Sequence, residues 1–156
     1  MEKKTKVNAI DGKQEILITR TFDLPVYLLF KAYTEAELIE QWMGNKVLKL
    51  ENKPHGCYRF ETKDENGNVV FSANGTIHDV IENQSITRTF EMDNAGFPVQ
   101  LEFLDFESVD ESKSNLIIKM VFRSVADRDN MLKLPFAQGI NLAHNRLQEI
   151  VSKLIN

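Results

Sequence analysis

The chain has 156 residues, of which 42% are hydrophobic and 27% are charged. This length suits one domain covering residues 1–156, and this composition excludes the disordered and fibrous classes of protein. The formal net charge of -4 offers no basic surface for a phosphate backbone, so nucleic acid is not an expected partner.

The first fourteen residues, MEKKTKVNAIDGKQ, are mostly polar and have no apolar run behind their lysines. They do not have the form of a secretory signal, and no stretch of about 18 apolar residues follows that could span a membrane. We therefore expect a cytoplasmic protein with no membrane span. The ordered core should cover about residues 15–155 and begin with a strand at 15–22, where apolar and polar side chains alternate.

Two short helices are expected after this strand. Asp23 is a suitable N-cap, and Pro25 suits a first helical turn because a proline there loses no hydrogen bond. Thr34 and Glu37 have the T-x-x-E spacing of a capping box, which predicts the start of the second helix. Gly44 is placed to end that helix.

From Lys46 to Arg123 the sequence consists of short segments separated by clusters of turn residues, which predicts an antiparallel meander of about six strands. Asn66-Gly67 is the clearest turn, because this pair tolerates positive φ angles and is typical of hairpins. It should join a strand that ends near Lys63 to one that begins at Val69.

The spacing of apolar residues returns to a helical period in the last part of the chain. Pro135 marks the start of a helix of about twenty residues, and residues 124–134 are expected to form a separate helical turn. The apolar stripe of the long helix consists of Phe136, Ile140, Ala143, Leu147, Ile150 or Val151, and Leu154. The element order is thus one strand, two short helices, six strands and one long helix.

Two stretches of the sequence match the pattern of a known family. The first, ITRTFDLPVYLLFKAYTEAELIEQWMG, matches at Thr19, Arg20, Thr21, Phe22, Pro25, Phe30, Ala32, Glu37 and Trp42. The second, PHGCYRFETKDENGNVVFSANGTIHDVIENQSITRTF, matches at Gly56, Tyr58, Phe60, Gly67, Phe71 and Gly75. On these residues the chain resembles the SRPBCC superfamily (START-related, helix-grip). Within it, the chain is similar to the homologues of the activator of heat-shock protein 90 ATPase from about Ile16 to Leu154.

The resemblance implies an α+β helix-grip fold, in which a strongly curved antiparallel sheet of about seven strands wraps around the long C-terminal helix. It also implies a cavity between sheet and helix, which in relatives holds apolar or amphipathic small molecules. The candidate lining residues are Trp42, Tyr58, Phe60, Phe71, Phe90, Phe103, Met120, Phe136, Ile140, His144 and Leu147. Plain packing of a helix on a sheet needs such side chains too, and the sequence leaves both interpretations open.

His144 lies at or beside the apolar stripe of the last helix. In a cavity it could bind the polar end of a ligand or shuttle a proton near neutral pH. At the edge of the stripe it would be a rim residue, which is the interpretation we favour. Arg20, Arg59 and Arg88 lie on predicted strands and are either further polar anchors or outward charges.

No residue is predicted to be catalytic, and no metal or cofactor is expected. The three histidines have no metal-ligand spacing, and Cys57, the only cysteine, gives neither an internal disulfide nor a cysteine-based zinc site. The isolated glycines form no phosphate-binding loop. Four carboxylates of EFLDFESVDES are interpreted as the solvated outer face of one strand: Glu102, Asp105, Glu107 and Asp110.

Three functions remain under consideration. The leading hypothesis is a non-catalytic protein that binds an apolar or amphipathic small molecule, with the polar end of the ligand met by His144 or a strand arginine. The second is an interaction module that contacts a chaperone or another protein, as the resemblance implies. The third is a cyclase- or dehydratase-like enzyme, for which His144 is the best acid–base candidate. Either a monomer or a homodimer fits the sequence.

Overall fold

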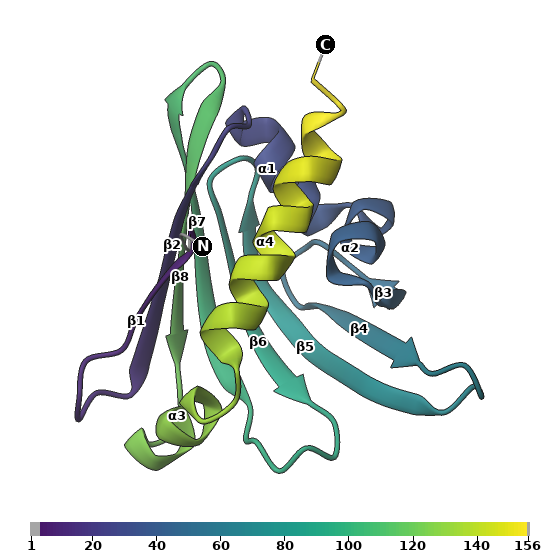
Figure 1. Cartoon of the computed structure of the whole chain (residues 1–156), viewed down its shortest axis with the longest axis vertical. Helices are drawn as coiled ribbons and strands as arrows, with labels where there is room; N and C mark the ends of the chain where they lie inside the picture. Colours follow the sequence, from purple (N-terminus) through teal and green to yellow (C-terminus); the bar gives the residue numbers. More distant parts are fainter. Residues whose placement is uncertain (1–3, 156) are drawn as a thin grey trace.

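The structure of the protein is a computed structural model that describes residues 4–155 and contains eight β-strands and four α-helices (Figure 1). The strands are β1 (Lys6–Asn8), β2 (Glu15–Phe22), β3 (Lys46–Leu50), β4 (Gly56–Lys63), β5 (Val69–Ile81), β6 (Ser85–Met92), β7 (Gln100–Asp110) and β8 (Lys113–Val121). The helices are α1 (Val26–Thr34), α2 (Ala36–Met43), α3 (Val125–Leu132) and α4 (Phe136–Ser152).

All eight strands form one curved antiparallel sheet in the order β1-β2-β8-β7-β6-β5-β4-β3. Strands β3 to β8 pair in sequence through short connections, whereas β2 pairs with β8 from far along the chain. The long helix α4 lies across the hollow side of the sheet (Figure 1). This arrangement is a helix-grip fold and confirms the predicted α+β class.

The sheet has one strand more than the seven or so that the sequence predicts. The additional strand is β1, which pairs with residues 17–19 of β2. It lies before the predicted ordered core, and its three residues are too few for alternation of apolar and polar side chains to be recognised.

Two glycines end elements as predicted. Gly44 closes α2 in the left-handed conformation, with φ of 73°. Gly67, with φ of 82°, lies in the connection between β4 and β5, where the Asp64 carboxylate accepts hydrogen bonds from the backbone N–H groups of Asn66 and Asn68. The predicted Asn66-Gly67 hairpin is therefore confirmed.

The predicted caps of the two short helices are wrong. The N-cap residues are Pro25 for α1 and Glu35 for α2, and neither helix start has a hydrogen bond from a capping side chain. The hydroxyl of Thr34 instead donates to the backbone oxygen of Phe30, because Thr34 still belongs to α1. Asp23 lies two residues too early to cap α1.

The last two helices begin where the sequence predicts. Ser124 caps α3, because its hydroxyl oxygen accepts a hydrogen bond from the backbone N–H of Asp127. The helix α4 begins directly after Pro135. The segment after the last strand thus forms a separate short helix before the long one.

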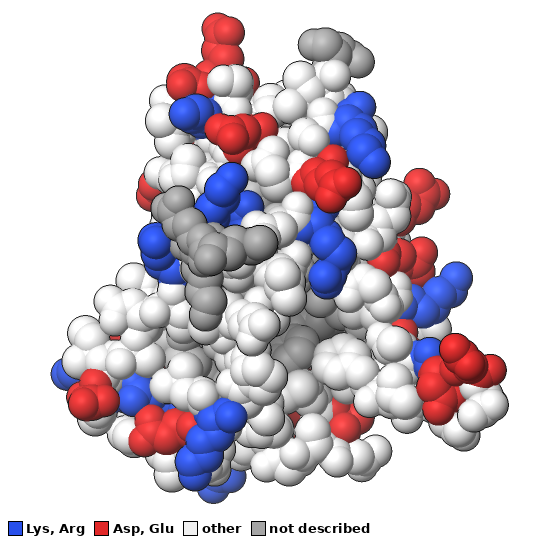
Figure 2. Space-filling view, in the orientation of Figure 1, with Lys and Arg blue, Asp and Glu red and all other residues white. Residues whose placement is uncertain are grey.

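The core lies between α4 and one face of the sheet. On β2, β7 and β8 every second side chain is buried, and we call the face that carries Ile18, Leu104 and Leu116 the concave face and the opposite one the convex face. Leu147 and Val151 of α4 have no exposed surface. The surface is hollowed beside the first half of α4 (Figure 2).

Candidate functional site

Most of the predicted lining residues lie on the concave face or on the helices that cover it. Tyr58 and Phe60 on β4 and Met120 on β8 are buried, whereas Phe71 on β5 and Phe90 on β6 are half-buried. The members on helices are Trp42 on α2, and Phe136, Ile140, His144 and Leu147 on α4. Burial alone does not distinguish a core residue from one that lines a cavity. The polar contacts of these residues are therefore described next.

Phe103 is the exception among the predicted lining residues. Successive side chains of a strand point to opposite faces, and Leu104 and Phe106 of β7 are buried on the concave face. Phe103 therefore lies on the convex face, where it is half-buried, and its inclusion in the lining is corrected. Leu101 and Phe103 point to one face of β7, and Leu104 and Phe106 point to the other. Both faces of the strand thus carry apolar side chains, so the sequence does not show which face lies toward α4.

Trp42 is a core residue between α1 and α4. Its side chain is almost fully buried, and its indole Nε1 donates a hydrogen bond of 2.7 Å to the backbone oxygen of Ala32. The centroid of its ring lies 5.1 Å from that of Tyr33 and 6.2 Å from that of His144. Its polar atom is thus already paired within the protein.

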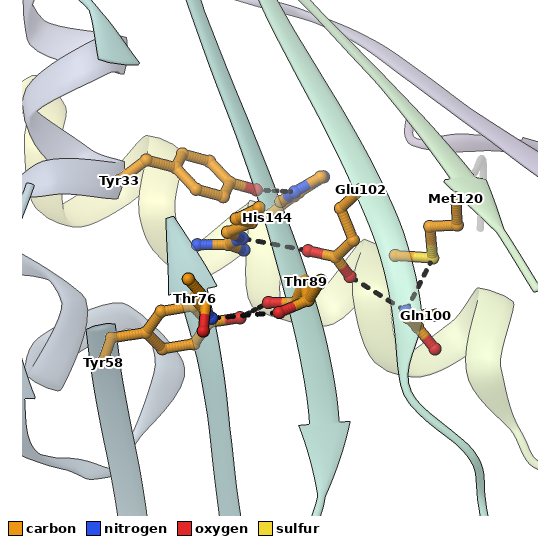
Figure 3. Close-up of polar contacts among 9 residues, drawn as sticks. Tyr33, Tyr58, Thr76, Thr89, Gln100, Glu102, Met120 and His144 are labelled. Carbon is orange, nitrogen blue, oxygen red and sulfur yellow. Dashed lines mark hydrogen bonds and ion pairs between the residues drawn. The ribbon is translucent and has the colours of Figure 1, made fainter. Parts of the chain in front are cut away.

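His144 is fully buried, and both of its ring nitrogens have hydrogen-bond partners. Nδ1 lies 2.9 Å from the hydroxyl of Thr5. Nε2 lies 2.9 Å from the hydroxyl of Tyr33 (Figure 3). The backbone N–H of Thr5 also donates to Oδ1 of Asn141 at 3.0 Å. We call His144, Thr5 and Tyr33 the His144 network, and it fastens the start of the chain to α4.

The surroundings of His144 keep its imidazole neutral. Burial, with a smaller contribution from the charge of Arg20, lowers the pKa of His144 to about 3. Because the residue is fully buried, the favoured interpretation as a rim residue is wrong. Both ring nitrogens already have hydroxyl partners within the protein. Its partners Tyr33 and Thr5 lie 111 and 139 positions away, too far for local sequence patterns to show.

The three strand arginines have different surroundings. Arg20 is buried and donates to the hydroxyl of Thr5 at 3.2 Å, so it supports the His144 network. Arg59 lies on the convex face and forms an ion pair with Asp93. Arg88 lies on the concave face of β6 and forms an ion pair with Glu102.

Arg88 and Glu102 form an ion pair on the concave face, which we call the interior pair. They are direct partners in the register of β6 and β7, and Nε of Arg88 donates to Oε1 of Glu102 at 3.0 Å. The second carboxylate oxygen accepts a hydrogen bond of 2.9 Å from Gln100, whose amide also lies 3.5 Å from the sulfur of Met120 (Figure 3). The side chains of the interior pair are 14% and 5% exposed, respectively.

The position of Glu102 contradicts the sequence-based interpretation of its strand. Asp105, Glu107 and Asp110 are exposed as expected, but Glu102 has the phase of Leu104 and points to the concave face. The charge is tolerated there because Arg88 lies directly opposite. Only the register between β6 and β7, which the sequence does not specify, reveals this pairing.

Tyr58 lines the interior pair from β4. Its ring centroid lies 5.2 Å from the guanidinium carbon of Arg88, and its hydroxyl donates to the backbone oxygen of Thr89 at 2.5 Å. Gly75 is its partner on β5, and a Cβ atom there would overlap both the Tyr58 ring and the Thr89 oxygen. Burial raises the pKa of Tyr58 above its ordinary value, so the phenol stays neutral.

The concave face is only partly covered along β6. Ile86 is buried, but Arg88, Phe90 and Met92 on the same face of this strand remain half-buried. The hollow in Figure 2 lies on the same side of the molecule, beside α4. Part of the surface of Arg88, Phe90 and Met92 therefore remains exposed on the concave face.

Other surface features of residues 4–155 do not include the interior pair. One depression of about 540 Å³ is partly lined by Lys4 and Lys6. Another of about 490 Å³ is lined by Asp93 and Asn94 and also by Met92 of β6. Within the described range, no three His, Cys, Asp or Glu side chains lie close enough together to hold a metal ion. None of the described helices is long and apolar enough to span a membrane.

The fold is shared with several solved structures. A crystal structure of a protein from Rhodobacter sphaeroides has a TM-score of 0.83 at 16% identity, covering 96% of this chain and 99% of that one. A protein from Mycobacterium smegmatis gives 0.79 at 16% identity, with coverages of 93% and 96%. A solution structure of a Staphylococcus epidermidis protein gives 0.78 at 20% identity, with coverages of 97% and 96%. At these identities the likeness shows the fold alone.

The family is shown by the sequence itself. No protein of curated function matches the chain. The profile of the family described as "Activator of Hsp90 ATPase homolog 1-like protein" matches residues 23–152. This range includes all four helices and strands β3 to β8. The chain therefore belongs to the family of activator of Hsp90 ATPase homolog 1-like proteins, within the SRPBCC superfamily.

Proposed function

We propose that the protein binds an apolar or amphipathic small molecule between α4 and the concave face of the sheet. The observation that carries the proposal is the incomplete cover of β6, where Arg88, Phe90 and Met92 face the helix side but remain half-buried. The helix-grip fold is consistent with ligand binding, because it sets a curved sheet against one helix.

The side chains around this part of β6 suit such a ligand. Phe90 and Met92 supply an apolar wall, and Phe136 and Ile140 of α4 are half-buried apolar residues on the helix. Methionine is unbranched and flexible, so Met92 can move to fit the ligand. Mostly apolar walls with a few polar groups are typical of small-molecule sites.

Desolvation would supply the binding energy. Burial of about 300 Å² of apolar ligand surface contributes about 7 kcal/mol before the costs of association, at roughly 25 cal/mol per Å². Each further methylene contributes about 0.8 kcal/mol, which is about fourfold in Kd. Affinity should therefore rise with the length of the apolar chain of the ligand.

Isothermal titration calorimetry with primary alkanamides from hexanamide to decanamide tests the proposal. We expect Kd to fall about fourfold with each methylene until the apolar wall is covered. Phe90→Ala should weaken decanamide binding, whereas Phe103→Ala should not, because Phe103 is a half-buried phenylalanine on the convex face. Absence of binding across the whole series, or equal weakening by both substitutions, would refute a site on the concave face.

A protein-binding role is a second candidate, favoured by two exposed valines. Val69 and Val70, at the start of β5, are 51% and 62% exposed beside the turn at Gly67. The family description names an activator of Hsp90 ATPase, so we test this chaperone as the partner. Sedimentation velocity with purified Hsp90 should show a complex that Val70→Ser weakens. Separate sedimentation of the two proteins at tens of micromolar would remove this candidate.

A further inference from the structure

The interior pair places one positive and one negative group at the polar end of the proposed site. We infer that the ligand carries an uncharged head group that both donates and accepts hydrogen bonds, such as a primary carboxamide or a hydroxyl, and that the interior pair receives it. The inference rests on the proposed function, since it names the head group of the same ligand.

Both members of the interior pair have unused hydrogen-bonding capacity. A guanidinium has five N–H donors, and among residues 4–155 Arg88 uses only Nε, toward Glu102. Its Nη atoms have no hydrogen-bond partner among the described residues and are not completely buried. A carboxylate has about four acceptor positions, and Glu102 uses two of them, toward Arg88 and Gln100. Free donors and free acceptors thus lie side by side.

The position of the pair fits the end of an elongated ligand. Arg88 and Phe90 point to the same face of β6, so a chain lying along Phe90 would bring its head group to Arg88. Glu102 is the more deeply buried member of the pair. The ring of Tyr58 also packs on the guanidinium, with its centroid 5.2 Å from the guanidinium carbon. The pair is therefore a fixed partner for the head group.

The charges select against an ionic head group. The Arg88 charge is already balanced by Glu102, 3.0 Å away, so an incoming carboxylate would lose its hydration and also approach a second carboxylate. An ammonium group would also lose its hydration and would approach the positive charge of Arg88. The neighbours Gln100, Met120 and Tyr58 carry no charge that could compensate. An amide exchanges its hydrogen bonds with water for those with the pair at a smaller cost.

Three probes of equal chain length test the inference on the whole chain at pH 7. Octanamide, octanoate and octylammonium are titrated calorimetrically, and we expect octanamide to bind at least tenfold more tightly than either ion. The ¹H–¹⁵N resonance of Arg88 Nε should shift with octanamide in a saturable way. Equal or tighter binding of octanoate or octylammonium would overturn the inference and leave the proposed function standing. Failure of all three to bind would overturn both.

A charge change at Glu102 gives an independent test. Glu102→Gln leaves Arg88 unbalanced, so octanoate should gain at least tenfold in affinity and overtake octanamide. Glu107→Gln removes the same charge from the exposed convex side of the same strand and should leave the order of affinities unchanged. An unchanged order in Glu102→Gln would contradict the inference. If Glu102→Gln does not fold, the comparison of octanamide, octanoate and octylammonium in the unsubstituted chain tests the inference by itself.

Discussion

The His144 network and the interior pair are both polar groups inside an apolar core, but they differ in how completely their hydrogen bonds are made. Thr5 and Tyr33 occupy both nitrogens of His144, while Arg88 and Glu102 keep donors and acceptors free. A complete network stabilises a buried polar residue, and an incomplete one near the surface is available to a ligand. His144 is thus structural, and the interior pair is the binding candidate.

Acid should destabilise the protein through His144. Its pKa is about 3 in the folded protein and about 6.5 in an unfolded chain, so between these values only the unfolded state binds the proton. The stabilising contribution is complete above pH 6.5 and decreases as the pH falls toward 3. Between pH 7 and pH 5 we expect a loss of about 2 kcal/mol in the free energy of unfolding, measured by urea denaturation.

Two glutamine substitutions separate this effect from other titrating groups. His144→Gln should lower stability at pH 7 but remove most of the difference between pH 7 and pH 5. His78→Gln changes an exposed histidine and should keep that difference. An equal pH dependence in the unsubstituted protein and in His144→Gln would show that His144 is not the responsible group.

Elements with an uninterrupted apolar period could be predicted from the sequence, and those defined by distant partners could not. The strand β2 and the start of α4 match the predictions because alternation in Glu15–Phe22 and the helical stripe after Pro135 are local patterns. Apolar residues of β7 point to both faces of the strand, so the sequence does not show to which face Glu102 points. The short strand β1 is defined by its pairing with β2, which no local pattern shows. Most of the predicted lining residues lie on the concave face or on the helices that cover it. Arg88 was among the predicted candidates for a polar anchor, but its partner Glu102 was assigned to the wrong face.

A pair of glycines tests the packing of β5 against β4. Gly75→Ala should destabilise the protein by about 2 kcal/mol or more, because the added Cβ would overlap the Tyr58 ring and a backbone oxygen. Gly139→Ala has open space around it on α4 and should stabilise the helix by roughly 0.5–1 kcal/mol. Urea denaturation measures both. A mild effect of Gly75→Ala would show that Tyr58 does not lie over Gly75.

Hydrogen bonds hold α4 from two sides of the molecule. On the N-terminal side, Thr5 binds His144 and Asn141 of the helix. On the other side, Nε of Arg146 donates to the backbone oxygen of Trp42 on α2 at 3.0 Å. No such bond joins α4 to β6 within residues 4–155, and Arg88, Phe90 and Met92 on the concave face of β6 remain half-buried. The partly covered strand β6 is thus not tied to the helix by a side-chain hydrogen bond in the described structure.

Methyl NMR of the methionines during a decanamide titration tests most directly whether a ligand binds between α4 and the concave face. Met92 and Met120 lie on this face, while Met131 is buried on α3. We expect saturable shifts of the Met92 and Met120 resonances with little change at Met131. Unchanged Met92 and Met120 resonances at saturating decanamide, or a shift at Met131 alone, would contradict binding at this site.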